Sequence, residues 1–385
     1  MLAYNSLANK FAIRLLYLLL TMVFVSYIPM IYLTSLYGRF SMGIMGVMAI
    51  IVLFTIPRSH FFKNSFFRIL TFAIFFLTIE FVVFYVGHLH FEIDDVRQIV
   101  IAFLCMIVGY SVNMTEKQMI RLCLFYIVGA VLLGGYAIVS YTGGFSFGND
   151  RNLITGKNQI GGMVAVAGAL TLYLYFILQE RKFVFLMFAI LAFAISAVLR
   201  DRSAFVAFAF FAIVMSFKIF PAHKVIIVTL LILLLYLVFR QVIDSFFTNV
   251  LIGRGSFDIE NLSTGRFERN RQGIQYLFDN FWEGELLHYS YIPLIHNYLL
   301  LRLVRYGVWS VLFVAVYAIF LIKMIKEYFR ERQLHLDSIG YFILIIPFFV
   351  SLLEPSFPYG PGTVQIMVYV LFGQTLQKKQ YRLRR

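Results

Sequence analysis

Residues 183–220 read FVFLMFAILAFAISAVLRDRSAFVAFAFFAIVMSFKIF and decide the class of fold. Two apolar runs, 183–199 and 204–220, flank a short charged turn. The hydrocarbon core of a bilayer is about 30 Å thick, and a helix of roughly 17–25 apolar residues crosses it. The stretch therefore predicts two consecutive transmembrane helices joined by a tight polar connection.

The composition extends this prediction to the whole chain. Of 385 residues, 61% are hydrophobic and 14% are charged, whereas soluble domains contain about 45–50% apolar and about 25% charged residues. This excludes a water-soluble enzyme. We predict an all-α, polytopic helical membrane protein with about twelve transmembrane helices and a single integral membrane domain, 1–385. The predicted spans are 13–36, 40–56, 67–87, 96–112, 118–141, 159–178, 183–199, 204–220, 225–243, 297–322, 338–354 and 363–376.

The ends of the chain and its cysteines add little further architecture. No cleavage-site pattern follows the first apolar run, so we expect a membrane anchor there and not a removed signal peptide. Cys105 and Cys123 both lie within apolar runs, which excludes a disulfide framework.

The distribution of basic residues predicts the orientation. With the N-terminus in the cytoplasm, the inner segments hold 20 of the 33 Lys and Arg residues, including ten of the eleven Lys. This pattern satisfies the positive-inside rule with both termini cytoplasmic. It predicts a multi-pass protein of the bacterial inner membrane. Because topology accounts for much of the net charge of +14, no nucleic-acid partner is expected.

The predicted outer segments contain twelve Arg but only one Lys, Lys157. A guanidinium grips phosphate or carboxylate in two places, while an ammonium acts as a point charge. The excess of Arg therefore favours binding of an anionic ligand at the periplasmic face. The alternative is that these Arg reach lipid headgroups or pair with outer acids.

One long connection, the predicted periplasmic loop 244–296, lies between spans nine and ten. Within it, residues 264–282 have the pattern of an amphipathic helix, with Ser263 or Thr264 as cap. One side carries Ile274, Leu277, Phe278, Phe281 and Trp282, and another carries Arg266, Arg269 and Asn270. Such a helix can lie in the membrane interface or can simply pack on the bundle.

The turn Arg200-Asp201-Arg202 contains the densest group of outer charges. A helix begins directly after it, and a helix N-terminus offers free N–H groups and a positive end to an anion. Arg200 and Arg202 are thus candidates for holding an oxyanion, although Asp201 can also neutralise one of them. Arg254, in the long loop, is a further candidate for substrate binding.

His296 and Asn297 open span ten, and Arg302 and Arg305 follow one and two turns later. Charge inside a span is costly and usually functional. Arg302 and Arg305 are therefore candidates for substrate binding, and Glu80 in span three can balance one of the arginines. His296 is a candidate proton acceptor near neutral pH, although a single histidine at an interface is more often a structural hydrogen-bonding group.

Other groups carry weaker signals. The cluster His88, His90, Glu92, Asp94 and Asp95 can ligate a divalent metal, but a mixed cluster on a loop is more often solvated. The Gly- and Asn-rich loop 142–158 suits sugar hydroxyls. The sequence contains no Walker loop and no dinucleotide fingerprint. We therefore predict neither a metal nor a cofactor.

Short motifs in residues 150–325 resemble the O-antigen polymerase and O-antigen ligase superfamily. Lys157-Asn158-Gln159-Ile160-Gly161-Gly162 opens a span as in that family, and Arg202-Ser203-Ala204 is similar to its SR(G/A) motif, with Asp201 in place of Ser. Gly265-Arg266 resembles the start of its GR region. Ile295-His296-Asn297-Tyr298-Leu299 is similar to its HN motif, and Arg305-Tyr306-Gly307 follows with Arg305 where an acid is common.

The resemblance implies a membrane glycosyltransferase of the C type. Its donor would be an oligosaccharide linked to undecaprenyl diphosphate, and the reaction would need no metal. By motif, Arg202 and Arg266 would hold the diphosphate and His296 would assist the acceptor hydroxyl. Arg200, Arg254, Arg269, Asn297, Arg302 and Arg305 would complete the substrate site. Membrane lipid and a chain-length regulator protein are the expected partners.

Three functions fit these observations. The first is an O-antigen polymerase, which transfers a growing glycan onto the next lipid-linked repeat unit. The second is an O-antigen ligase, which transfers the finished glycan to lipid A–core. The third is a flippase or transporter for lipid-linked glycans, which twelve spans also suit; such proteins often contain internal repeats, and none is visible here.

Overall fold

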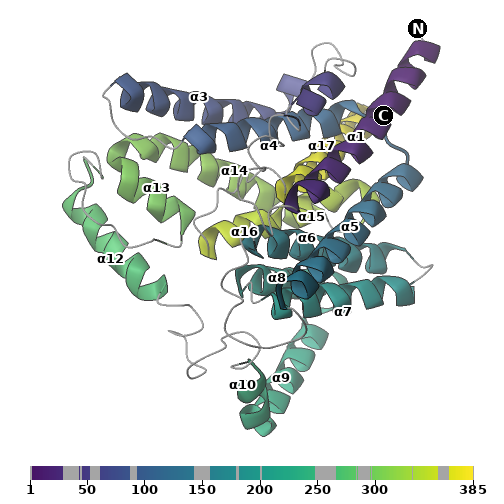
Figure 1. Cartoon of the computed structure of the whole chain (residues 1–385), viewed down its shortest axis with the longest axis vertical. Helices are drawn as coiled ribbons and strands as arrows, with labels where there is room; N and C mark the ends of the chain where they lie inside the picture. Colours follow the sequence, from purple (N-terminus) through teal and green to yellow (C-terminus); the bar gives the residue numbers. More distant parts are fainter. Residues whose placement is uncertain are drawn as a thin grey trace.

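A computed structural model shows how these segments pack. It describes residues 2–28, 43, 46–52, 61–86, 93–142, 157–178, 182–199, 202–247, 266–282, 284, 295, 297–331, 333–353 and 364–384. Over these residues every regular element is a helix, and the helices form one bundle (Figure 1).

The first half of the bundle contains long helices, most of which follow the predicted apolar runs, although the first begins well before the predicted run 13–36. They are α1 (Leu2–Tyr27), the 3₁₀ turn η2 (Phe61–Lys63), α3 (Ser65–Val86), α4 (Ile93–Ser111), α5 (Glu116–Thr142), α6 (Lys157–Ile177), α7 (Lys182–Val198), α8 (Arg202–Ile219) and α9 (Ala222–Val238).

The second half is more broken. It comprises α10 (Arg240–Phe247), α12 (Arg266–Asp279), α13 (Tyr298–Tyr306), the 3₁₀ turn η5 (Gly307–Ser310), α14 (Val311–Arg330), the 3₁₀ turn η6 (Leu336–Ser338), α15 (Ile339–Ile343), α16 (Ile345–Leu353) and α17 (Val364–Arg384).

Among the described residues, six helical segments are long and apolar enough to cross a membrane, and four shorter apolar helices accompany them. The short helix α9 shows the environment most clearly. It projects from the bundle at the bottom of Figure 1, and its apolar side chains are about half exposed, among them Ile226, Leu230 and Leu234. A helix that is apolar on all sides and barely packed requires an apolar solvent. The chain is therefore a helical membrane protein.

Two predicted spans differ from the observed helices in an informative way. The predicted span 297–322 is interrupted, because Gly307 has a φ of +55° and the chain passes through η5 before α14 begins. The predicted span 363–376 belongs to a longer helix, α17, which continues to Arg384. Parts of the predicted spans 13–36 and 40–56 lie outside the described residues.

Close packing in the bundle depends on small residues. Gly109 of α4 and Gly373 of α17 each lie against the backbone of the other helix, so that an added Cβ would collide with main-chain atoms. Membrane helices associate through such surfaces, because lipid tails supply no hydrophobic force between helices and close backbone approach strengthens van der Waals contact. This contact lies within the stretch Ile366–Gln377, over which α17 is buried.

Hydrogen bonds connect helix ends that the predicted topology places on the same side. Asn9 of α1 exchanges two hydrogen bonds of 2.8 Å with the backbone of Asn113, in the turn between α4 and α5. Lys218 of α8 donates to the Glu331 carbonyl after α14 at 2.8 Å. The grouping of these ends agrees with the predicted alternation of the helices, while the assignment of this side to the cytoplasm stays a prediction.

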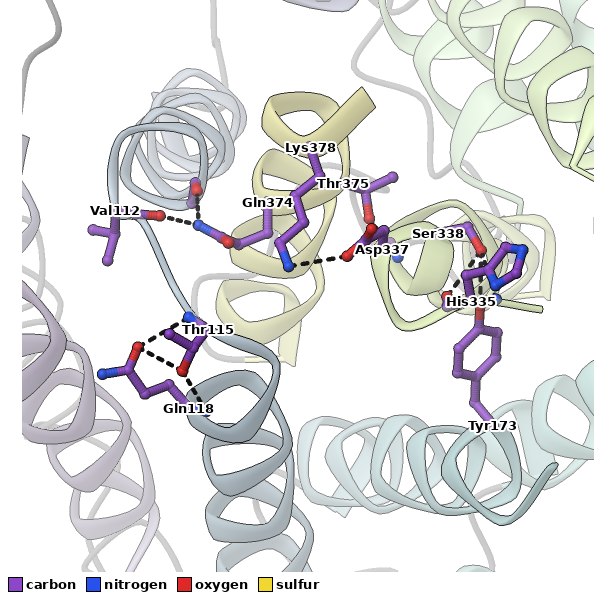
Figure 2. Close-up of polar contacts among 12 residues, drawn as sticks. Val112, Thr115, Gln118, Tyr173, His335, Asp337, Ser338, Gln374, Thr375 and Lys378 are labelled. Carbon is purple, nitrogen blue, oxygen red and sulfur yellow. Dashed lines mark hydrogen bonds and ion pairs between the residues drawn. The ribbon is translucent and has the colours of Figure 1, made fainter. Parts of the chain in front are cut away.

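The middle of α17 is fixed to three neighbouring elements by polar contacts (Figure 2). Gln374 donates to the Val112 carbonyl at the end of α4. The Thr375 hydroxyl accepts a backbone N–H of α15 at 3.0 Å, and the Lys378 ammonium lies 2.9 Å from Asp337 in η6. Gln374 and Thr375 thus supply partners for backbone groups at the ends of adjacent helices, which have none within their own helix.

The connection between α14 and α15 is held in the same way. His335 and Ser338 form a capping box around η6, and the Tyr173 hydroxyl of α6 donates to the His335 carbonyl at 2.7 Å (Figure 2). We call this side, with the N-terminal end of α3 and the C-terminal ends of α14 and α17, the Lys-rich end.

Candidate functional site

The predicted amphipathic helix exists as α12 and packs against α13, at the left of Figure 1. Its contact with the adjoining segment depends on Gly273, because a Cβ at this position would lie 2.6 Å from the Cδ1 atom of Ile295. Ile295 is fully buried and stands two residues before Asn297. The packing of α12 thus fixes the segment that enters α13.

A second contact joins the ends of the two helices through glycines with positive φ. Gly284 and Gly307 have φ values of +59° and +55°, and an added Cβ on either would lie 2.5 Å from a carbonyl oxygen of the other segment. The Val308 N–H donates to the Phe281 carbonyl at 2.8 Å. Only glycine adopts this backbone without strain, so the break in span ten positions α12.

Arg266 and Asn297 meet at the C-terminal end of α16. The Arg266 guanidinium donates to the Leu353 carbonyl at 2.7 Å, and the Asn297 side-chain amide donates to the adjacent Leu352 carbonyl at 3.4 Å. The last carbonyls of a helix have no partner within it and form its negative end. Two predicted site residues, 31 positions apart in sequence, are therefore brought together by one helix end.

Asn297 has a second role as the N-cap of α13. Its side-chain oxygen accepts the Leu300 N–H at 3.0 Å, the usual arrangement of a capping residue. The cap fixes where α13 begins. We call the region formed by α12, α13 and the C-terminal end of α16 the Arg-rich end.

The apolar face of α12 points away from the protein. Phe267, Ile274, Phe278 and Trp282 are 65%, 46%, 82% and 74% exposed, while Arg266 on the opposite face contacts α16. A helix packed on a soluble protein would show the reverse arrangement. This geometry favours an interfacial helix with its aromatic side chains at headgroup level.

Arg302 lies deeper, in a buried ion pair with Glu80 of α3. Both side chains are almost inaccessible, at 1% and 3% exposed. The guanidinium carbon also lies 4.1 Å from the centre of the Tyr306 ring. The sequence prediction that Glu80 balances an arginine is confirmed. Arg302, predicted to bind substrate, is instead enclosed in protein, so we assign it to positioning α13 against α3.

The other charged residues of α12 and α13 are more accessible. Arg269 and Arg305 are both partly exposed. Arg271 lies on the outside of α12 and donates to Glu268 at 3.0 Å, and this hydrogen bond lowers the pKa of the Glu268 carboxyl below its ordinary value. Arg271 therefore has a partner on its own helix, whereas the Arg266 guanidinium donates to a carbonyl of α16.

The structure describes only some of the remaining predicted residues. Arg202 is the first residue of α8, where the charged turn was expected to start a helix. Arg200, Arg254 and His296 lie outside the described residues, as do His88, His90 and Glu92 of the possible metal cluster. Their roles stay predictions.

Two features of the site were not found from the sequence. Tyr306 supports the Arg302 guanidinium, and the spacing of four residues between them is a signal that was available. The Leu353 carbonyl that receives Arg266 is main chain 87 positions away, and no local pattern indicates such a partner.

No protein family model matches the chain, and no curated protein is similar enough in sequence to count as a relative.

Proposed function

We propose that this chain is a membrane glycosyltransferase that acts as an O-antigen polymerase. In this proposal it transfers a growing glycan from undecaprenyl diphosphate to a hydroxyl group of the next lipid-linked repeat unit. The reaction takes place at the periplasmic face of the bacterial inner membrane. A chain-length regulator is the expected protein partner.

The observation that carries the proposal is the arrangement of Arg266 and Asn297 on the end of α16. This contact places an arginine-bearing interfacial helix beside the segment that contains the HN motif. A lipid-linked diphosphate has its charged group at headgroup depth, which is where α12 would lie if its exposed aromatic face enters the membrane. Arginine suits this ligand because its planar fork matches phosphate oxygens.

The proposed reaction balances without a nucleotide. The acceptor hydroxyl oxygen attacks the anomeric carbon, and the bond between that carbon and the diphosphate oxygen breaks. The leaving lipid diphosphate keeps the electron pair, and the hydroxyl proton passes to His296. Arg202 and Arg266 stabilise the charge that grows on the leaving oxygen, an effect typically worth about 2.7–4 kcal/mol for each donor removed.

Arg302 contributes indirectly in this scheme. Its ion pair with Glu80 of α3 holds α13 in place, and Tyr306 of the same helix supports the guanidinium. Because α13 begins directly after the HN motif, Arg302 serves as a positioning residue for the acceptor-side group, His296.

The activity can be tested with purified protein in liposomes and lipid-linked repeat units as the substrate. The proposal expects longer glycans to accumulate without an ion gradient or ATP. Arg266→Lys should reduce this activity, while Arg271→Lys, on the same helix but paired with Glu268, serves as a matched control. Movement of lipid-linked glycan across the membrane without lengthening would indicate the flippase alternative and contradict the proposal.

Gene deletion separates the polymerase from the ligase. Loss of a polymerase should leave lipopolysaccharide that carries a single repeat unit. Loss of a ligase should leave lipid A–core without any repeat unit. The second outcome would retain the glycosyltransferase chemistry but move the acceptor from a lipid-linked repeat unit to lipid A–core.

A further inference from the structure

A cavity of about 300 Å³ opens at the Lys-rich end, between α3, α14 and α17. Its charged lining comprises Lys63, Lys323, Arg330, Lys379 and one carboxylate among the described residues, Glu327. These groups leave an excess of three positive charges around one hollow. Like charges repel one another at short distances, so their convergence around one hollow favours binding of an anion.

The protein holds two of these cations in place. The Lys379 ammonium pairs with Glu327 and lies 5.4 Å from the centre of the Tyr341 ring. The Lys323 ammonium donates to the Ser65 hydroxyl. Each ammonium carries three N–H donors, and contact with a ring attracts the cation without using a donor. The arrangement therefore orders positive charge and retains capacity for hydrogen bonds.

The N-terminus of α3 adds to the same charge. Asn64 caps this helix by accepting the Phe66 N–H at 2.9 Å, and both residues line the cavity. The first turn of a helix carries roughly half a positive charge. The buried side chains of Tyr341 and Leu376 add apolar surface to the same lining.

We propose that this cavity binds a phosphate-bearing anion, either the headgroup of an anionic phospholipid or a soluble phosphate compound. Several positive charges around one hollow match a multivalent oxyanion better than a single carboxylate. Basic pockets between transmembrane helices are known to receive anionic lipid headgroups. The site is separate from the Arg-rich end and does not depend on the proposed function.

Binding can be measured with the purified full-length protein in neutral detergent. One arm compares phosphatidylglycerol with phosphatidylcholine of the same acyl chains, and the other uses pyrophosphate. The pocket variant is Lys63→Gln with Arg330→Gln, because both side chains are exposed and their loss should not disturb folding. The control, Lys117→Gln with Lys326→Gln, removes two exposed cations outside the cavity lining.

We expect the pocket variant to bind about 30-fold more weakly. It loses two cations, and each Lys or Arg near an anionic headgroup contributes a similar favourable attraction. Weakening in the phosphatidylglycerol arm identifies a lipid ligand, and weakening in the pyrophosphate arm identifies a soluble one. Glu327→Gln should tighten binding, an effect that a folding defect cannot produce. Equal binding by the pocket and control variants, or no tightening by Glu327→Gln, would overturn the proposal.

Discussion

The two ends of the bundle carry positive charge in different chemical forms. The segments predicted to lie outside contain twelve Arg and one Lys, while those predicted to lie inside contain ten of each. At the Arg-rich end, Arg266 and Arg302 are directed onto a carbonyl and a carboxylate of other helices. At the Lys-rich end, ammonium groups gather around a cavity.

This difference indicates two kinds of recognition. A guanidinium that donates to one fixed partner presents its other N–H groups in a defined orientation. This suits a ligand that must be aligned for reaction. Ammonium groups around a hollow provide charge with little directional demand, which suits retention of an anion. A count of basic residues without regard to their type would miss this difference.

The largest expected effect concerns the histidines at the two ends. His296→Ala should lower glycan transfer by about 10²–10⁴-fold if His296 accepts the hydroxyl proton. His335→Ala at the Lys-rich end keeps the backbone N–H and carbonyl that contact Ser338 and Tyr173 and should leave turnover near the wild-type rate. Steady-state kinetics check both, and turnover lost more than donor binding would indicate an interaction made mainly in the transition state. Restoration of turnover by His296→Gln would mean that the residue only positions the acceptor.

The second effect compares two ion pairs. Arg302→Ala leaves the Glu80 carboxylate buried without its cation and should cost about 3–5 kcal/mol of folding stability. Lys378→Ala breaks the more accessible pair with Asp337, whose side chains are 19% and 20% exposed, and should cost about 1 kcal/mol or less. Thermal unfolding in detergent measures both.

A rescue variant tests the reason for the Arg302 effect. Replacing the pair by Arg302→Met with Glu80→Leu removes both charges together and should recover most of the lost stability. If Arg302→Ala unfolds no more easily than Lys378→Ala, the buried pair does not hold α13 as we describe.

The third effect tests the Arg266 guanidinium, which donates to the end of α16. Arg266→Lys keeps the charge but loses the planar fork, and we expect glycan transfer to fall by roughly ten- to a hundredfold, below the full cost of losing an oxyanion donor. Arg271→Lys should be nearly silent, because that side chain is exposed and contacts Glu268. Similar activity of the two variants in membranes with equal protein levels would remove Arg266 from the site.

The smallest expected effect is that of metal removal. Treatment with EDTA should leave transfer unchanged, and so should Asp94→Ala combined with Asp95→Ala, because the proposed chemistry relies on arginine and histidine. Loss of activity that returns on adding Mg²⁺ or Mn²⁺ would restore the segment around the start of α4 as a metal site.

Much of the fold could be predicted from the sequence because a membrane imposes a simple rule on helix length. The runs 183–199 and 204–220 correspond closely to α7 and α8. The break at Gly307 was not predicted, since its reason is a contact with the segment after α12 that hydropathy does not report.

The candidate site could be predicted in part. The arginines within span ten stood out because charge in a span is rare, and the pairing of Arg302 with Glu80 is confirmed, whereas the role of His296 stays a prediction. The burial of Arg302 was not predicted. The spacing places Arg302 on the same helix face as Arg305, but the sequence does not show that α3 covers the Arg302 side chain. The cavity at the Lys-rich end was also not predicted. Its cations come from three separate elements, η2, α14 and α17, and each cation alone fits the positive-inside pattern.

The most direct test of the account is a structure of the protein with a lipid diphosphate bound. The account predicts the diphosphate at the Arg-rich end, within hydrogen-bond distance of the Arg266 guanidinium, about 2.7–2.9 Å, with His296 within one water molecule of the reacting sugar. A diphosphate found instead among the lysines at the opposite end, with the Arg-rich end empty, would contradict it.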